Sequence, residues 1–507
     1  MRCEALTETK RDRTLLNVIA TVSFQVITLL SGFIIPRLIL GAFGSEINGL
    51  VSSITQFLNY ISLLEGGVSA VILANLYKPL ATKDNEKISA VVVTAESFFK
   101  KLALIFLVYQ FVLAALYPFF IKSELSWGYV ASLTLILGLS IFIQYYFALT
   151  WRLLLQADKK MYVSVLVQGT AVILNLAATV ILIKLYPSIH VVKFAAGVAF
   201  FVQPFILNRY IDKNYTLDKK ATPDPRLLAQ RWDGFGINIA AMIHASTATV
   251  VLTFVGELTD VSVFSVYLFI ANGLKSLITS ISGGIVPTIG NAYGKGDIKE
   301  CGRLFGVYDL IMFFVSFLVF TVAAATAAPF AMVYTSGVTD ANYYRPLLGF
   351  LLMAGECIFC IRDPYVNMAY SANHFRRVSK YAYAEAAINV VLSVLFGIFW
   401  GMDGVALGLL ISIAFRTLTQ AIYLKHNILR RPLGSFFIKL LCFSLAAVAA
   451  FLLCARLYEI SSYSWTDWIL FAMKIGFTSL PFMLAAAFIS ARRECVQLIN
   501  VVFSRKG

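Results

Sequence analysis

Long apolar segments recur from one end of the chain to the other, separated by short polar turns. Each segment is about 20 residues or longer, which is enough for an α-helix to cross the hydrocarbon core of a bilayer. The pattern therefore predicts an all-α, polytopic membrane protein with about fourteen transmembrane helices. The predicted helices are roughly residues 14–41, 46–76, 100–121, 127–151, 161–184, 190–210, 233–256, 260–290, 305–333, 345–372, 377–399, 402–424, 434–456 and 466–490.

The composition agrees with this pattern. Of the 507 residues, 59% are hydrophobic and 14% are charged, whereas a soluble domain is about 25% charged. This excludes the roughly three soluble domains that length alone suggests. The 7 cysteines lie mostly in apolar segments and predict no disulfide framework. Cys357 and Cys360 form a C-x-x-C pair inside a hydrophobic helix, where we interpret them as small packing residues rather than a metal or redox site.

Basic residues mark one end of the predicted helices. Most of the 42 Lys and Arg residues fall in the turns on one side, including the segment 209–231. Because cytoplasmic loops of membrane proteins are enriched in Lys and Arg, we predict that both termini are cytoplasmic and that the chain spans the cytoplasmic (plasma) membrane. The net charge of +15 then faces the anionic inner leaflet. Membrane lipids, and not nucleic acid, are the expected partners of this charge.

A polar connector divides the chain. We interpret residues 211–232 as a solvated cytoplasmic linker because they are rich in charge and contain two prolines. This linker separates an N-terminal lobe at 1–210, with helices 1–6, from a C-terminal lobe at 233–424, with helices 7–12. Residues 425–507 add two further helices and a cytoplasmic tail.

The two predicted lobes share weak sequence similarity. The pair Gly66-Gly67 interrupts the second predicted helix and Gly283-Gly284 interrupts the eighth, and an Asn-x-Tyr sequence follows both. Glycine in a membrane helix permits bending or close backbone approach. Six crossings in each lobe would make the two copies a parallel repeat, for which a transport site between the lobes is expected. Chance similarity between apolar segments is the alternative explanation.

Residues 34–72 carry a family resemblance. They contain Pro36-Arg37 at the end of the first helix, the turn Gly41-x-x-Gly44, and the sequence Leu64-Glu65-Gly66-Gly67 in the second helix. With the fourteen-helix layout, the chain resembles the Wzx-type polysaccharide flippases of the multidrug/oligosaccharidyl-lipid/polysaccharide exporter superfamily. The resemblance implies transport of undecaprenyl-diphosphate-linked oligosaccharide across the cytoplasmic membrane during surface polysaccharide biosynthesis. A polysaccharide polymerase and glycosyltransferases are the protein partners that this process implies.

Few ionisable residues lie within the predicted helices, where they are costly and usually face a cavity or each other. A diphosphate crossing the membrane needs compensating charge, which Arg supplies through paired hydrogen bonds and Lys as a point charge. We therefore expect Arg37, Lys275 and Arg362 to line a central cationic cavity. Glu65 is expected either to neutralise Lys275 or to take up a proton. The other cavity candidates are Gln25, Asn272, Arg416 and Lys474.

Each of these charges also has a structural interpretation. Arg37 lies near a helix end and could extend to the interface. Arg362 and its neighbour Asp363 cannot face each other on a helix, so each could pair with another helix. His244 is more typical of a helix contact than of a proton relay.

Enzyme chemistry has little support in the sequence. We find no G-x-x-x-x-G-K-[ST], G-x-G-x-x-G, H-E-x-x-H or G-x-S-x-G motif, and we expect neither catalytic residues nor a cofactor. Two other functions stay open. An ion-coupled multidrug exporter of the same superfamily would share the layout, although cationic drugs favour an acidic cavity. A membrane glycosyltransferase or ligase commonly needs a larger outer loop than this pattern predicts.

Overall fold

The computed structural model describes a helical protein, and the prediction of an all-α membrane protein is confirmed. Within the part of the chain that it describes, no residue is in a strand, and 10 helices are long and apolar enough to cross a membrane. The described residues are 2–65, 67–218, 221–232, 235–429 and 431–503.

The chain divides into two compact units. Unit 1 comprises Met1–Met242 and Glu257–Thr259, and unit 2 comprises Ile243–Gly256 and Asp260–Gly507. The boundary falls within the helix α10 (Phe235–Val255), so this helix contributes residues to both units.

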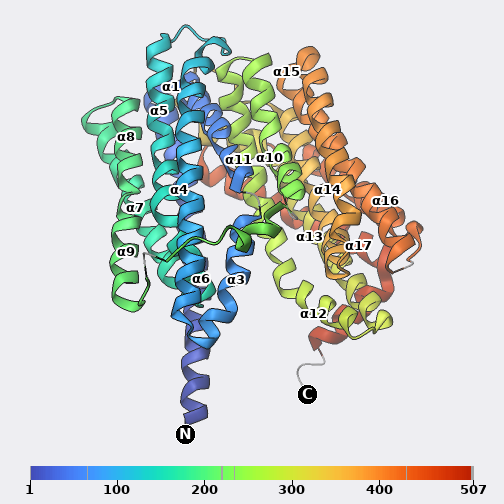
Figure 1. Ribbon diagram of the computed structural model, residues 1–507. Coiled ribbons are helices and arrows are strands. Elements are labelled where there is room, and N and C mark those ends of the chain that lie inside the picture. Colours follow the sequence, from blue (N-terminus) through green and yellow to red (C-terminus); the bar gives the residue numbers. More distant parts are fainter. Residues whose placement is uncertain (1, 66, 219–220, 233–234, 430, 504–507) are drawn as a thin grey trace. The chain divides into compact units, whose positions relative to one another are not determined.

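Unit 1 is a bundle of helices, shown in blue to green in Figure 1. Its elements are α1 (Arg2–Asn59), α2 (Ile61–Glu65), α3 (Val68–Thr82), α4 (Asn85–Leu116), η1 (Tyr117–Phe119), α5 (Trp127–Ile143), η2 (Gln144–Ala148), α6 (Leu149–Ala157), α7 (Met161–Leu185), α8 (Ile189–Ala199), α9 (Val202–Asn214) and η3 (Pro225–Trp232).

Gly44 bends α1 where the sequence predicts a turn between the first two helices. Its backbone has φ 81° and ψ 178°, a conformation open to glycine and strained for other residues. The second predicted helix is broken again near its glycine pair, because α2 ends at Glu65 and α3 begins at Val68. Gly66 itself lies outside the described residues.

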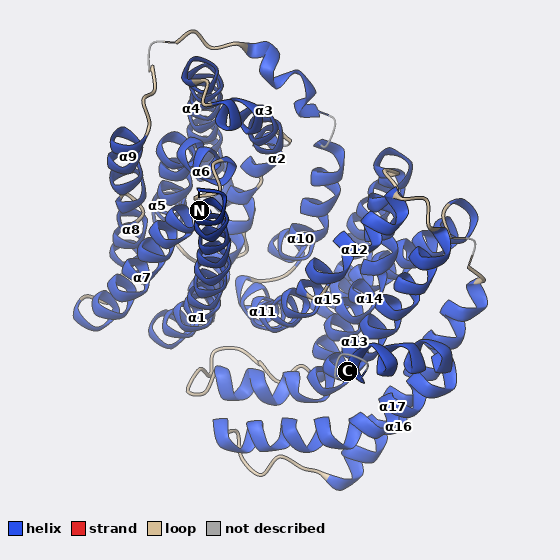
Figure 2. Ribbon diagram, turned by 90° about the horizontal axis from the view of Figure 1, so that it is seen from below, coloured by secondary structure: helices blue, strands red, loops and turns tan. Residues whose placement is uncertain are grey.

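Unit 2 is a second helical bundle (Figure 1). Besides the C-terminal part of α10, its elements are α11 (Leu258–Ser280), α12 (Ser282–Gly294), α13 (Ile298–Tyr334), α14 (Pro346–Ser371), α15 (Phe375–Asn427), α16 (Leu433–Leu457) and α17 (Trp465–Phe503). Figure 2 shows α16 and α17 side by side next to α13, with which both make contacts.

Gly401 folds α15 back on itself, between the predicted helices at 377–399 and 402–424. Its φ of 57° and ψ of −137° are unfavourable for residues with a side chain. The two halves of α15 then touch backbone to backbone, because a Cβ atom on Gly404 would lie 2.0 Å from the carbonyl oxygen of Phe396. This reversal brings side chains from the two halves together, which matters for the site described below.

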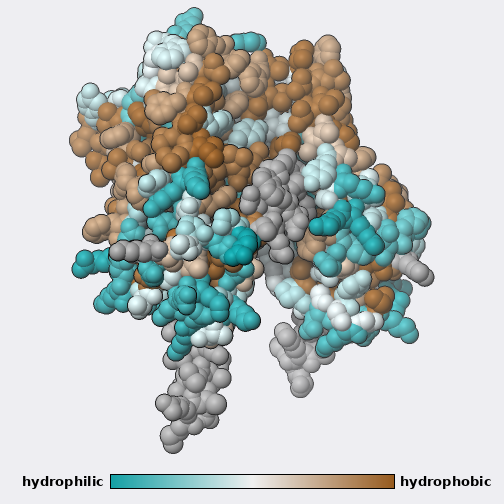
Figure 3. Space-filling view, viewed as in Figure 1, coloured by the Kyte–Doolittle hydropathy of each residue, from teal (hydrophilic) through white to brown (hydrophobic). Residues whose placement is uncertain are grey.

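The outer surfaces of both units are apolar, as expected of helices that face lipid. Large hydrophobic side chains are exposed along the helices, for example Val108, Phe205 and Ile489. Polar side chains gather at one end of each bundle, near α3 in unit 1 and near α12 in unit 2 (Figure 3). Each unit therefore has the surface pattern of a membrane protein. Apolar side chains face outward along the helices, and polar side chains gather at one end.

The connector at 211–232 is less solvated than the sequence suggests. The backbone N–H of Asp218 donates to Ser89 Oγ at 3.0 Å, and that of Asp224 donates to Thr94 Oγ1 at 2.9 Å. The side chain of Asn75 donates to the carbonyl of Leu227 at 2.8 Å, and Leu228 is buried in the core of unit 1. The connector therefore lies against α3 and α4. Its leucines account for the difference, since they gain more from burial than from exposure to water.

A buried ion pair joins α16 to α13 within unit 2. Lys439 Nζ lies 2.6 Å from Asp309 Oδ2, and both side chains are almost completely inaccessible. Lys439 lies near the start of α16. The lysine lies inside the bundle because Asp309 supplies the opposite charge there.

Replacing Lys439 with Ala should destabilise the protein by about 3–5 kcal/mol, because it leaves a buried carboxylate without its partner. Chemical unfolding in detergent measures this change. The double variant Lys439→Met with Asp309→Leu should recover most of the loss, since it removes both charges. As the control, Arg303→Ala breaks a half-exposed pair with Glu300 and should cost less than about 1 kcal/mol. Equal losses for the buried and exposed pairs would contradict this account.

Candidate functional site

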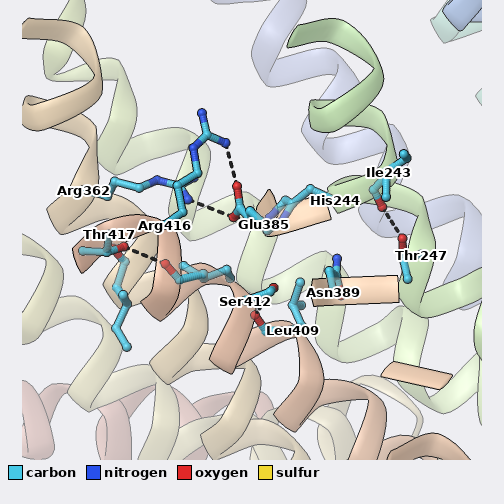
Figure 4. Close-up of polar contacts among 12 residues, drawn as sticks. Ile243, His244, Thr247, Arg362, Glu385, Asn389, Leu409, Ser412, Arg416 and Thr417 are labelled. Carbon is cyan, nitrogen blue, oxygen red and sulfur yellow. Dashed lines mark hydrogen bonds and ion pairs between the residues drawn. The ribbon is translucent and has the colours of Figure 1, made fainter. Parts of the chain in front are cut away.

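Six ionisable side chains gather inside unit 2, on α10, α11, α14 and both halves of α15. We refer to them as the charge cluster, and Figure 4 shows its centre. The members of the charge cluster are His244, Lys275, Glu356, Arg362, Glu385 and Arg416.

Glu385 holds the centre of the charge cluster. Arg362 Nη1 donates to its Oε1 at 2.8 Å, and Arg416 Nη1 donates to its Oε2 at 2.6 Å. Only 2% of the Glu385 side chain is exposed. The carboxylate thus compensates two guanidinium groups at once, one on α14 and one on the second half of α15 (Figure 4). Because water has little access to this site, removal of one ionic partner should strongly destabilise the protein, since the remaining charge would stay buried without an opposite charge.

A second ion pair, between Lys275 and Glu356, is more accessible. The ammonium nitrogen lies 2.9 Å from Glu356 Oε1, and the lysine side chain is 21% exposed, against 3% for the glutamate. This bond uses one of the three N–H donors of the lysine. Within the described residues the other two have no hydrogen-bond partner, and neither has Glu356 Oε2. Lys275 is therefore the cation of the cluster best able to bind something else.

Phe359 lies between the two ion pairs. Its ring centroid is 5.0 Å from Lys275 Nζ and 4.4 Å from the guanidinium carbon of Arg362. The face of an aromatic ring attracts cations at such distances. The Phe359 ring therefore helps to hold both cations in place, and it adds no negative charge. This role cannot be predicted from the sequence, because Phe359 is one of many aromatic residues in apolar helices.

His244 completes the charge cluster. Its Nδ1 is 3.5 Å from Glu385 Oε1, and in the described structure this buried atom has no hydrogen-bond partner. Without a charge on His244, the charge cluster contains three cations and two carboxylates. It carries an excess of one positive charge.

The structure brings together three of the predicted cavity residues, namely Lys275, Arg362 and Arg416. Within unit 2, the carboxylate at ion-pair distance from Lys275 is that of Glu356, on α14. The sequence alone does not show which acidic residue on another helix comes within reach.

The other predicted residues lie outside the charge cluster's ion pairs. Arg37 is half-buried and Gln25 is exposed, both on α1 of unit 1. Asn272 is exposed on α11, three residues before Lys275 and so on a neighbouring part of the helix face. Lys474 is exposed on α17 and lies over the Tyr458 ring, 5.9 Å from its centroid.

Asp363 faces away from its neighbour Arg362. Its Oδ2 accepts hydrogen bonds from Ser282 Oγ, from the Tyr308 hydroxyl at 2.9 Å and from Asn367 Nδ2 at 2.9 Å. We refer to these four residues as the Asp363 network. The expectation that adjacent helical residues pair with different helices is met here, since Arg362 bonds to α15 and Asp363 to α12 and α13.

Unit 1 contains a related polar group at its own helix break. Glu65 accepts hydrogen bonds from Ser69 Oγ and, at 2.9 Å, from the Tyr145 hydroxyl. Arg152 interacts electrostatically with Glu65 and donates to Gln144 Oε1 at 3.3 Å. Arg152 is half-buried on α6, next to the π-helical turn η2. Such π turns are frequent at functional sites.

Comparison with known proteins gives a fold but no family assignment. No family model matches the chain, and no curated protein matches it in sequence. Among solved structures, the fold is that of polytopic lipid and drug transporters. It is similar to the lipid II flippase MurJ in an inward closed conformation, with a TM-score of 0.75 and 16% identity over 94% of this chain and 100% of that one.

Two transporters of the multidrug resistance (MATE) type are also similar in fold. An inward-facing MATE family transporter of the MOP superfamily has a TM-score of 0.59 and 14% identity over 79% of this chain and 93% of that one. The eukaryotic MATE transporter AtDTX14 has a TM-score of 0.53 and 14% identity over 94% of this chain and 99% of that one.

Replacing Glu385 with Gln should lower the unfolding free energy by about 3–5 kcal/mol, because two guanidinium groups lose their common counter-charge. Glu356→Gln should cost less, about 1.5–3 kcal/mol, because it removes one charged hydrogen bond to a lysine that water partly reaches. Unfolding of the two purified variants in detergent measures the loss of unfolding free energy in each and shows which loss is larger. If Glu356→Gln is equally or more damaging, Glu385 does not hold the centre of the cluster.

Proposed function

We propose that the chain is a flippase for an oligosaccharide joined through a diphosphate to an undecaprenyl lipid. It would move this substrate across the cytoplasmic membrane for surface polysaccharide biosynthesis, with both termini in the cytoplasm. Two findings support the proposal. The fold is similar to that of a lipid II flippase over that protein's full length. The charge cluster is positive inside a membrane-spanning bundle.

The excess positive charge is the observation on which the proposal depends. A diphosphate brings negative charge into a medium of low dielectric constant, where an uncompensated ion is expensive. Lys275 is suited to meet it, because it is the most accessible cation of the cluster and keeps two N–H donors for a ligand. The guanidinium groups of Arg362 and Arg416 are already hydrogen-bonded to Glu385. They would attract the diphosphate electrostatically from a distance.

Binding would proceed by exchange of partners. In the structure Glu356 compensates Lys275, and an arriving phosphate competes with this carboxylate for the ammonium group. Arg362 also interacts electrostatically with Glu356. Glu356 therefore keeps a cationic neighbour while Lys275 turns to the substrate. No stage of this exchange leaves a buried charge without an opposite charge nearby.

The remaining predicted residues would serve the rest of a large substrate. Arg37 supplies a further cation in unit 1, and Glu65 lies at the break between α2 and α3. Gln25 and Asn272 are exposed amides, which suit sugar hydroxyl groups. Alternating access by the lobes at 1–210 and 233–424 would carry the substrate across, and a polymerase and glycosyltransferases would act before and after it.

An ion-coupled multidrug exporter is the second candidate function. The similarity in fold to MATE transporters supports it. So do Glu65 and Asp363, which have no basic side chain within ion-pair distance among the described residues and could attract a cationic drug. A deletion strain separates the candidates: loss of surface glycan with normal drug sensitivity favours the flippase, and the opposite result favours the exporter.

Lys275→Ala should reduce the export of lipid-linked glycan by about tenfold to a hundredfold, the equivalent of losing one or two charged hydrogen bonds to phosphate. Lys275→Arg should retain part of the activity because it keeps the charge. Surface glycan, normalised to the amount of protein in the membrane, measures the effect.

Lys299→Ala is the matched control, because it removes an exposed lysine on α13 of the same unit and should leave export unchanged. Equal export by wild type and Lys275→Ala at equal expression would exclude the proposed role of Lys275.

A further inference from the structure

A small pocket lies in unit 2 between the end of α15 and the start of α16. The second half of α15 returns here to the end at which α14 finishes, because Tyr423 packs against Ala369. Side chains from α13, α14, α15 and α16 line the pocket. Its polar lining residues are Asp309, Tyr365, Lys425, Arg431 and Ser435. The pocket shares no residue with the charge cluster, so it is separate from the site proposed for the cargo.

Two cations at this pocket share a single carboxylate. Lys425 lies in the last turn of α15 and has neither an ion pair nor a hydrogen-bond partner within the described residues. Arg431 donates from Nη2 to Glu494 Oε1 at 2.7 Å, whereas its Nη1 is buried without a partner. These three groups leave one positive charge in excess. The pocket is therefore suited to an anion.

The guanidinium group of Arg431 is held in place by α13. Its central carbon lies 5.6 Å from the centroid of the Phe305 ring, at which distance an aromatic face attracts a cation. A Cβ atom on Gly306 would lie 3.2 Å from both Nη1 and Nη2, so the absence of a side chain there makes room for the group. A guanidinium group that is already ordered loses little freedom when it binds a phosphate.

The start of α16 adds hydrogen-bond donors next to these cations. Pro432 occupies the N-cap position and provides no side-chain cap. In the described structure the backbone N–H groups of Leu433 and Gly434 have no acceptor, and the Ser435 hydroxyl has no partner. Uncapped N–H groups at the start of a helix favour a phosphate, because they point toward it and carry the positive end of the helix dipole.

Asp309 provides an acceptor among the lining residues of the pocket. Its Oδ2 is bonded to Lys439, and Tyr365 interacts electrostatically with the same carboxyl group. Its Oδ1 is buried without a hydrogen-bond partner in the described part of the chain. The space inside the pocket is about 20 Å³, which admits a group the size of a water molecule. A hydroxyl group of a ligand would fit there and donate to Asp309.

The surroundings of the pocket indicate a lipid rather than a free phosphate ion. Large apolar side chains are exposed on both helices beside it, namely Ile422 on α15 and Phe437 and Leu441 on α16. Acyl chains attached to a bound phosphate could lie along these side chains. We propose that the pocket binds the headgroup of an anionic phospholipid that carries a hydroxyl group, of the phosphatidylglycerol type. Basic pockets between membrane helices on the cytoplasmic side are suited to such headgroups.

Native mass spectrometry of the purified full-length chain with added lipid tests this proposal. Phosphatidylglycerol should bind about tenfold more tightly than phosphatidylcholine, because its headgroup has a net negative charge. Phosphatidylmethanol has the same charge but no headgroup hydroxyl, and it should bind about fivefold less tightly than phosphatidylglycerol, the effect of one lost hydrogen bond. Inorganic phosphate should not displace the bound lipid.

Two variants separate a built site from general attraction to a basic surface. Lys425→Ala should weaken phosphatidylglycerol binding by about fivefold, the effect of one basic residue at a membrane surface. Ser435→Leu narrows the pocket without changing its charge, and it should weaken binding at least as much. Lys295→Ala is the matched control, because it removes an exposed lysine at the end of α12 and should leave binding unchanged.

Unfolding in phosphatidylcholine shows whether each variant is folded, and Lys425→Ala carries the test if Ser435→Leu is not. Equal binding of phosphatidylglycerol and phosphatidylcholine, equal losses in Lys425→Ala and Lys295→Ala, or displacement by inorganic phosphate would overturn the proposal. Equal binding of phosphatidylglycerol and phosphatidylmethanol would overturn the contact with Asp309. None of these results bears on the proposed flippase function, which depends on Lys275.

Discussion

A charge inside a membrane-spanning bundle must be compensated by a group from another helix, and this constraint explains much of the structure. Glu385 joins α14 to both halves of α15 through Arg362 and Arg416, and Asp309 joins α13 to α16 through Lys439. Apolar packing alone gives little preference among helices in lipid, since lipid tails are as apolar as leucine. Buried pairs, in contrast, are satisfied in one arrangement only. The ionisable residues thus identify which helices must touch.

The two units repeat one contact at their helix breaks. In unit 1, Glu65 at the end of α2 bonds to Tyr145, and in unit 2, Ser282 at the start of α12 bonds to Asp363. Both contacts join the broken helix to the helix about 80 residues further along the chain. In unit 1 the carboxylate lies on the broken helix and the hydroxyl lies on the later helix. In unit 2 the hydroxyl lies on the broken helix and the carboxylate lies on the later one. This equivalence is stronger support for an internal repeat than the glycine pairs, because it preserves an interaction rather than a residue type.

The sequence predicted the helices well and the contacts poorly, for a physical reason. Hydropathy identifies the spans and the breaks between them locally, and Gly44 and Gly401 lie at two of these breaks. Charge pairing depends on which faces of distant helices meet, so the sequence identifies Lys275 as intramembrane but does not identify Glu356 as its partner. The sequence likewise does not show that Arg152 and Lys439 are shielded from water, because they lie near helix ends, where only their burial distinguishes them from loop residues. Phe359 has no sequence signal, since its role depends on the two cations beside it.

Paired cations also bear on how such a bundle could select its cargo. A site with free positive charges would bind any anion and would be costly when empty. In the charge cluster, the empty state is stabilised by Glu356 and Glu385, so a ligand must supply more negative charge than the carboxylate it displaces. A diphosphate meets this requirement, and a neutral sugar or a cation does not. Under the proposed function, the accessible Lys275 pair and the inaccessible Arg362–Glu385–Arg416 group would have different tasks. The first would exchange partners, and the second would keep the helices in register during this exchange.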